Sequence, residues 1–160
     1  MDSMNNTVFD LSEAYERYAD ILYRIALGIL SSPHDAEDAV ADVFVSFAAK
    51  PKSFEDSEHE KAWFIRATVN KCRDLQRRRS VRSHSPIEEA AEIADGIDHF
   101  AHTESIMHDI LTLPEKYRTV ILLHYFEDLS VDEVASVLSI GRSAVKMRLA
   151  RAREMLKDIL

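Results

Sequence analysis

The chain has 160 residues, of which 46% are hydrophobic and 30% are charged, and its formal net charge is -8. This composition is typical of a globular protein and excludes a disordered chain. No apolar run reaches the length of a membrane span, and the first ten residues lack the pattern of a signal peptide, so we expect a cytoplasmic protein without membrane insertion. Glycine and proline are scarce, and apolar residues recur every three or four positions, which predicts an all-α fold.

Charged residues are sorted into blocks along the chain. Residues 61–82 hold eight Lys or Arg residues and one acid, and residues 141–160 hold six and two, whereas residues 31–60 hold eight acids and two lysines. The overall charge is therefore a poor guide to partners, because two basic segments suited to nucleic acid lie in an acidic chain. Cys72 is single, which excludes an internal disulfide, and we expect it to be a small buried apolar residue.

The first fifty residues predict two helices. Apolar residues keep helical spacing over residues 11–30, which indicates a core helix. Ser32 and Pro33 then provide an N-cap and a first helical residue for a second helix. The outer face of this second helix is acidic, and Ala41 and Val45 lie among its acids. That mixture leaves room for a protein partner with a basic rim.

A polar loop at residues 50–60 precedes a third predicted helix at residues 60–79. Trp63 and Phe64 begin its apolar side, and we expect them in the core. Its other side combines arginines, which neutralise phosphates, with an asparagine that can bond a base. The candidate DNA-binding residues of this helix are Arg66, Asn70, Arg73, Arg77 and Arg78. Residues 81–103 lose the helical period and predict a flexible acidic linker, whose histidines match no zinc-binding pattern, so no metal site is expected.

The last thirty residues have the pattern of a helix-turn-helix. Ser130 and Glu133 match a capping box, which predicts the start of a helix. We expect the turn after that helix to place Gly141 in the left-handed conformation. From Arg142 onward an apolar stripe is paired with a basic face that includes Lys146, flanked by Arg148 and Arg151. This order favours insertion of the second helix into a major groove.

Two groups of motifs resemble a known family. Residues 113–118 (Leu-Pro-Glu-Lys-Tyr-Arg), residues 126–130 and the helix-turn-helix resemble the C-terminal promoter-binding domain of bacterial sigma factors. Residues 35–44 and 62–79 resemble the N-terminal core domain of the compact extracytoplasmic-function group. The resemblance implies a region 2-like domain at residues 1–80, a linker at residues 81–103 and a region 4-like domain at residues 104–160.

The resemblance also implies a function and its sites. The chain would bind core RNA polymerase, direct it to promoter DNA and help to open the duplex, without being an enzyme. The second helix would contact the polymerase clamp through Asp35, Asp38, Ala41, Asp42 and Val45, although the family usually has glutamine and glutamate where Ala41 and Asp42 stand. The third helix and the loop before it would bind the downstream (minus-ten) element. The residues implied for the upstream (minus-thirty-five) element are Arg142, Ser143, Lys146, Met147, Arg148 and Arg151. An anti-sigma protein is a further expected partner, and no catalytic residue, cofactor or small-molecule substrate is expected.

Other functions fit parts of the sequence. A stand-alone helix-turn-helix regulator would use its N-terminal helices to dimerise on a palindrome, but it would not need the acidic second helix. An enzyme acting on nucleic acid has no support, because no phosphate loop, metal-ligand cluster or nucleophile with a paired base is recognisable. A separate hypothesis is that Glu88, Glu89 and Glu92 dock on the basic helices of the free protein and mask them.

Overall fold

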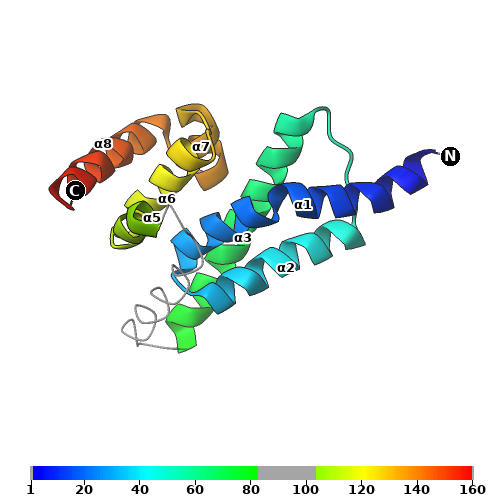
Figure 1. Cartoon of the computed structure of the whole chain (residues 1–160), viewed down its shortest axis with the longest axis horizontal. Helices are drawn as coiled ribbons and strands as arrows, with labels where there is room; N and C mark the ends of the chain where they lie inside the picture. Colours follow the sequence, from blue (N-terminus) through cyan, green and yellow to red (C-terminus); the bar gives the residue numbers. More distant parts are fainter. Residues whose placement is uncertain (1, 83–103, 160) are drawn as a thin grey trace.

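The computed structural model describes residues 2–82 and 104–159, and the side chains of residues 11–80 and 106–158. Every regular element in these ranges is helical, which confirms the predicted all-α fold. The helices form two bundles (Figure 1). The first bundle contains α1 (Asp2–Leu30), α2 (Pro33–Ala49) and α3 (Ser57–Arg82); the second contains α5 (Glu104–Leu111), α6 (Glu115–Ile121), the π-helical turn η1 (Leu122–Phe126), α7 (Val131–Leu138) and α8 (Arg142–Ile159). Residues 83–103, which make up most of the predicted linker and include its proposed masking acids, lie outside the described residues.

The first bundle is built around an aromatic core. α2 runs back along α1, and α3 packs against both (Figure 1). Phe64 of α3 is fully buried, and its ring centroid lies 5.1 Å from those of Tyr18 on α1 and Phe47 on α2. Trp63 packs on the same cluster, which confirms that both aromatic residues belong to the core. The Ser32 hydroxyl accepts a hydrogen bond from the amide of Asp35, so the predicted cap of α2 is confirmed.

Two helices of this bundle extend beyond their predicted bounds. α1 begins at Asp2 rather than residue 11, and α3 runs from Ser57 to Arg82 rather than over residues 60–79. In both cases the added residues are mainly polar. A prediction from apolar spacing cannot detect such turns, because their sequences have no regular apolar period.

The second bundle contains the predicted helix-turn-helix in α7 and α8. The Ser130 hydroxyl accepts from the Glu133 amide at 3.1 Å and the Glu133 carboxylate accepts from the Ser130 amide at 2.8 Å, which confirms the capping box. The expectation for Gly141 is wrong. Ser139 takes the left-handed conformation, with a φ of 57°, and none of the glycines in the described residues has positive φ.

The turn adopts this form because α7 ends in a Schellman motif. The Ile140 amide donates to the Ala135 carbonyl at 3.1 Å and the Ser139 amide donates to the Ser136 carbonyl, which fixes the left-handed residue at Ser139. The carbonyl of Gly141 then accepts the first helical bond of α8, from the Val145 amide. Position 139 is therefore set by the end of α7, and Gly141 belongs to the start of α8.

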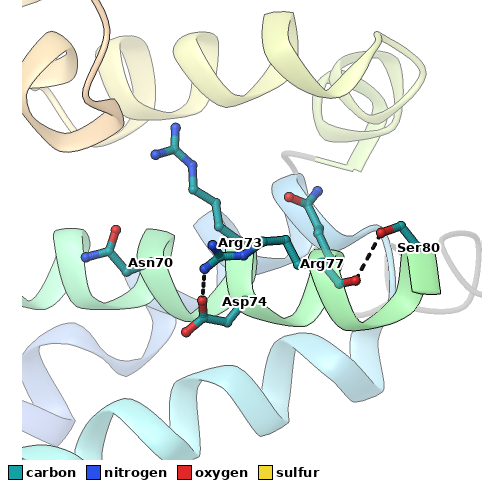
Figure 2. Close-up of a pocket in the computed structure, with 6 residues that line it drawn as sticks. Asn70, Arg73, Asp74, Arg77 and Ser80 are labelled. Carbon is teal, nitrogen blue, oxygen red and sulfur yellow. Dashed lines mark hydrogen bonds and ion pairs between the residues drawn. The ribbon is translucent and has the colours of Figure 1, made fainter. Parts of the chain in front are cut away.

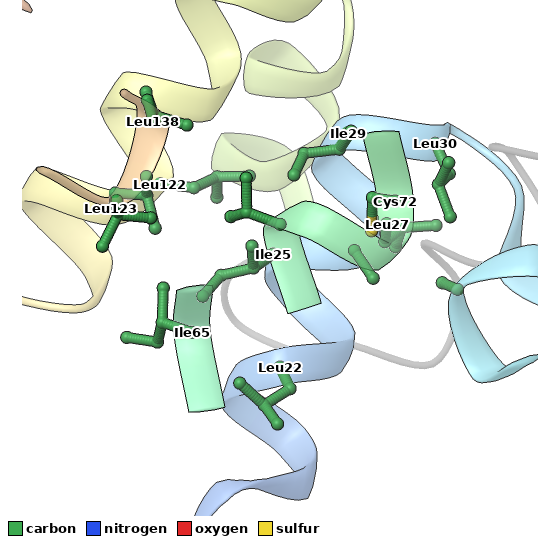
Figure 3. Packing of buried hydrophobic residues seen from close by; sticks show 14 of the residues in the cluster. Leu22, Ile25, Leu27, Ile29, Leu30, Ile65, Cys72, Leu122, Leu123 and Leu138 are labelled. Atoms are coloured by element: carbon green, nitrogen blue, oxygen red, sulfur yellow. The ribbon is translucent and has the colours of Figure 1, made fainter. Parts of the chain in front are cut away.

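The two bundles pack directly against each other. α6 and η1 contact α1, and α7 contacts α3. Buried apolar side chains from both bundles form one continuous cluster, in which Figure 3 shows Leu122, Leu123 and Leu138 of the second bundle with Ile25, Ile29 and Ile65 of the first. Gly28 allows the close approach of α1 and η1, since a Cβ there would lie 2.1 Å from Cδ1 of Leu122. The sequence had suggested two small bundles that are each marginal alone, and the shared core supplies the burial that each lacks.

Candidate nucleic-acid and polymerase interfaces

The six residues predicted for the upstream element come together on the N-terminal half of α8. We call this set, namely Arg142, Ser143, Lys146, Met147, Arg148 and Arg151, the candidate upstream surface. Five of the six side chains are exposed, and Met147 retains 71% of its accessible surface although it is apolar. The buried side of α8 is held by Val145, Leu149 and Ala152. The ion pairs of this surface, Arg142 with Asp132 and Arg151 with Glu154, are exposed and therefore weak enough to exchange for phosphate contacts.

The candidate downstream surface lies along α3 and consists of Arg66, Asn70, Arg73, Arg77 and Arg78. Asn70, Arg73 and Arg77 line an open recess of about 740 Å³ (Figure 2). Arg77 is paired with Asp74 one turn away, and Asn70 and Arg78 are exposed to solvent. This recess presents cationic groups and an amide together, which suits contact with a nucleic-acid strand.

Two arginines of the candidate downstream surface are held by the second bundle. The guanidinium of Arg66 donates to the hydroxyl of Ser136, and that of Arg73 donates to the backbone carbonyl of Leu138 at 2.7 Å. In Figure 2 the Arg73 side chain extends away from α3, while Arg77 lies along its own helix. The carbonyl of Leu138 belongs to the last turn of α7, where the helix dipole favours a cation. The structure therefore joins the two regions predicted to bind DNA.

The residues predicted to contact polymerase lie on the outer face of α2, and we call Asp35, Asp38, Ala41, Asp42 and Val45 the candidate polymerase surface. Asp38, Ala41 and Val45 are exposed, and Val45 borders an apolar recess lined also by Tyr15 and Phe44. Asp35 is paired with Arg79 of α3, and Asp42, which is also exposed, is paired with Lys71 of α3 at 3.1 Å, whereas Asp38 lies 3.5 Å from His34 of its own helix. Asp35 and Asp42 therefore help to fix α2 on α3.

A set of polar contacts at the junction of the bundles was not predicted. Glu127 keeps 3% of its side-chain surface, and its carboxylate is paired with Arg24 of α1 at 3.0 Å. Its backbone carbonyl accepts from Lys61 of α3 at 2.9 Å. Burial raises the pKa of the Glu127 carboxyl above its usual value, and the charge of Arg24 partly opposes that shift. An arginine inside the apolar stretch of residues 18–30 was the one sign in the sequence of a buried partner.

Arg118 completes this junction from α6. Its guanidinium donates to the carbonyls of Gly28 and Ile29 and, at 2.6 Å, to the hydroxyl of Ser31. These acceptors lie at the C-terminal end of α1, whose last turn contains no basic residue of its own. A cation supplied by the second bundle therefore satisfies free carbonyls and the negative end of the α1 dipole.

The remaining chemistry of the described residues is simple. They contain no cluster of His, Cys, Asp and Glu able to hold a metal ion. None of their helices is long and apolar enough to cross a membrane. Cys72 is fully buried, as predicted, and burial raises the pKa of its thiol to about 12.

Both bundles are similar to domains of known proteins. Residues 14–82 match the model of Sigma-70 region 2, and residues 104–156 match that of Sigma-70 region 4. The chain is 31% identical over 158 residues to the ECF RNA polymerase sigma factor SigW of Bacillus subtilis, covering 89% of this chain and 84% of the relative. The fold is similar to that of CnrH solved with the cytosolic domain of CnrY, with a TM-score of 0.62, 27% identity, and coverage of 93% of this chain and 86% of that one. It is also similar to that of the sigma factor RpoE solved with the anti-sigma factor NepR from Bartonella quintana, with a TM-score of 0.68, 21% identity, and coverage of 93% and 95%.

Proposed function

We propose, from the premise that this chain belongs to the extracytoplasmic-function group of RNA polymerase sigma factors, that its three candidate surfaces each have one partner in transcription initiation. As a sigma factor the chain binds core RNA polymerase and directs promoter recognition. The observation that carries this conclusion is the presence of region 2 and region 4 in order within one chain. Membership of this family favours a sigma factor over a stand-alone regulator.

The candidate upstream surface is proposed to bind the minus-thirty-five element. Its α8 helix is presented by the turn after α7, and the side chains of its first turns project from the protein. Arg142 and Arg151 are suited to phosphates or guanine edges, and Lys146 to phosphates. The exposed Met147 is suited to an apolar contact such as a thymine methyl group.

The candidate downstream surface is proposed to bind the minus-ten element with the loop that precedes α3. Arg77 and Arg78 supply charge, and Asn70 supplies an amide that can bond a base edge. In the adjoining loop, Lys52 lies 5.4 Å from the centroid of the Trp63 ring, and Phe54 packs on the same aromatic cluster. This cluster gives the loop a fixed base against which a strand can be positioned.

The candidate polymerase surface is proposed to bind the clamp of the largest polymerase subunit. Its exposed members combine negative charge with apolar area, which suits a partner helix with a basic rim; they are Asp38, Ala41, Asp42 and Val45. Asp42 is already paired with Lys71. The contribution of Asp42 is therefore expected to be smaller than that of Asp38. An anti-sigma protein is proposed as a second partner, since the sigma factor RpoE, whose fold is similar, was solved in complex with the anti-sigma factor NepR.

Transcription in vitro with purified core polymerase on a promoter pool tests the function. We expect the wild-type chain to start RNA synthesis at defined sites. Lys146→Ala is expected to weaken use of the upstream element and to leave polymerase binding intact, whereas Asp38→Arg is expected to weaken polymerase binding. The proposal fails if the chain neither associates with polymerase nor starts transcription. The assignment of surfaces fails if both variants lose the same step.

A further inference from the structure

We infer that Asp74 and Arg77 form one base-reading pair within the candidate downstream surface, which selects a base with an exocyclic amino group over a base with a keto group. The favoured bases are adenine and cytosine, and the rejected ones are guanine and thymine. The inference rests on the proposed function, because it names what the α3 surface reads in the minus-ten element. Asp74 itself is not among the five residues of that surface.

The position of Asp74 is unusual for an acid. Residues 61–82 hold eight Lys or Arg residues and this single acid. Asp74 lies one helical turn after Asn70 and one turn before Arg77, so the three side chains share a face of α3. All three line the open recess of about 740 Å³, where Figure 2 shows Asp74 between the other two along the helix. The carboxylate therefore lies where a nucleic-acid strand would be held.

The pair of Asp74 and Arg77 is available for a ligand. Two other groups of the recess, Arg73 and Gln76, donate to backbone carbonyls of α7 and α1. Asp74 and Arg77 instead bond each other on their own helix (Figure 2). Their side chains keep 48% and 77% of their surface exposed, and an exposed ion pair adds little to stability. Either residue can therefore be replaced without loss of the fold.

A carboxylate in this recess favours one class of base. It repels the phosphate groups of a strand, and it can only accept hydrogen bonds. Adenine and cytosine carry an exocyclic amino group that can donate to it, at N6 and N4. Guanine and thymine carry a keto oxygen at the same ring position, which would face the carboxylate as acceptor against acceptor. Asp74 therefore favours the amino bases and rejects the keto bases.

Arg77 supplies the second half of the contact. A free arginine fork favours guanine, because it donates to O6 and N7 together. In this structure the guanidinium is bonded to Asp74, so the recess presents an acceptor beside donors rather than a free fork. Adenine matches this arrangement with its N6 amino group beside N7, and cytosine with its N4 amino group beside N3. Asp74 is thus a specificity-determining residue, and it also restrains the preference of Arg77.

The test uses full-length chains assembled with purified core polymerase. Each holoenzyme transcribes a library in which the minus-ten element of a promoter used by the wild type is randomised. Every template carries a transcribed barcode, so sequencing of the RNA ranks the four bases at each position. The variants are Asp74→Ala, Arg77→Ala and the two combined. Asp20→Ala is the control, because it removes an exposed carboxylate from α1, outside the three candidate surfaces.

We expect the wild type and the control to favour adenine or cytosine over guanine and thymine at one position, by about 5- to 10-fold. Asp74→Ala should lose this preference and favour guanine there, because the fork of Arg77 is then free. Arg77→Ala should keep the preference for amino bases in weaker form, and the double variant should favour neither class. Removal of a negative charge also raises affinity for every sequence. A change in the order of bases, and not a gain in overall use, therefore supports the inference.

The inference is overturned if the wild type favours amino bases at no position, if Asp74→Ala leaves the order of bases unchanged, or if its shift to guanine persists in the double variant. Circular dichroism identifies a variant that fails to fold. Asp74→Asn then decides the result, since it keeps the size of the side chain but adds a donor, and it should accept keto bases as readily as amino bases. A wild type that transcribes while the variants keep its base order retains the proposed function and loses this inference. A wild type that starts no RNA synthesis loses both.

Discussion

The ion pair between Arg24 and Glu127 offers a quantitative test of the junction between the bundles. Its carboxylate is 3% exposed and its guanidinium partner is 28% exposed, with a separation of 3.0 Å. The pair is made by one terminal nitrogen of the Arg24 guanidinium, and the buried Nε atom of Arg24 has no hydrogen-bond partner among the described residues. Removing either charge alone therefore leaves the other charge poorly solvated and without its partner. Replacing both residues with apolar ones leaves no unpaired charge at the junction.

We expect Arg24→Met and Glu127→Leu each to lower the free energy of unfolding by about 2 to 3 kcal/mol, less than a fully buried pair would because Arg24 keeps some contact with water. The double variant should lie within about 1 kcal/mol of the wild type. Urea denaturation of all four chains gives the coupling energy, which we expect to be at least about 2 kcal/mol. A coupling energy below about 0.5 kcal/mol would refute the reasoning.

The stability of the same four chains should also depend on pH in different ways. Burial already raises the pKa of Glu127, and loss of Arg24 removes the charge that opposes this shift. In Arg24→Met the folded state should hold the carboxyl proton more tightly than the unfolded state. The stability that this carboxyl group contributes is then fully present below its pKa in the unfolded state. It is lost as pH rises through its pKa in the folded state. The loss in free energy of unfolding of Arg24→Met relative to the wild type should therefore become smaller as pH falls from about 7 to about 5. The double variant, which lacks the carboxyl group, should not show this change.

Three further outcomes are expected. Ser139→Gly should raise the free energy of unfolding by about 0.5 to 1 kcal/mol, because Ser139 has a φ of 57°. Gly141→Ala should be tolerated, because nothing lies within 4 Å of the added Cβ. Urea denaturation measures both effects. Lys146→Ala should lower the slope of log affinity against log salt by about 0.9 for an upstream-element duplex, and an unchanged slope would remove Lys146 from the phosphate contacts. The Cys72 thiol, which is fully buried and has its pKa raised to about 12, should react with iodoacetamide far more slowly in the folded chain than in urea at about pH 8, and stability should fall as pH rises from about 9 toward 12.

Much of the local structure could be predicted from sequence because its causes are local. The capping box at Ser130 and the cap at Ser32 depend on residues three positions apart, and both are present as predicted. The left-handed residue of the turn was predicted at the wrong position. Glycine is the residue with the lowest intrinsic cost there, but the hydrogen bonds at the end of α7 place the strain on Ser139.

The candidate surfaces show the limit of such local reasoning. Their residues share helix faces, which periodicity alone predicts, and five of the six candidate residues of α8 are exposed. Periodicity does not tell whether an exposed-looking arginine meets water or another helix. Arg66 and Arg73 therefore resembled their neighbours in sequence, yet both contact the second bundle.

The sequence by itself determined the helical class, the two bundles, the helix-turn-helix and the family, because each follows from apolar spacing, caps and motifs within short stretches of chain. Only the tertiary structure decided how the bundles meet. The partners in each pair, such as Gly28 with Leu122 and Arg24 with Glu127, are about a hundred residues apart. Neither member has a chemical reason to choose the other until the whole chain has folded and excluded water from the space between them.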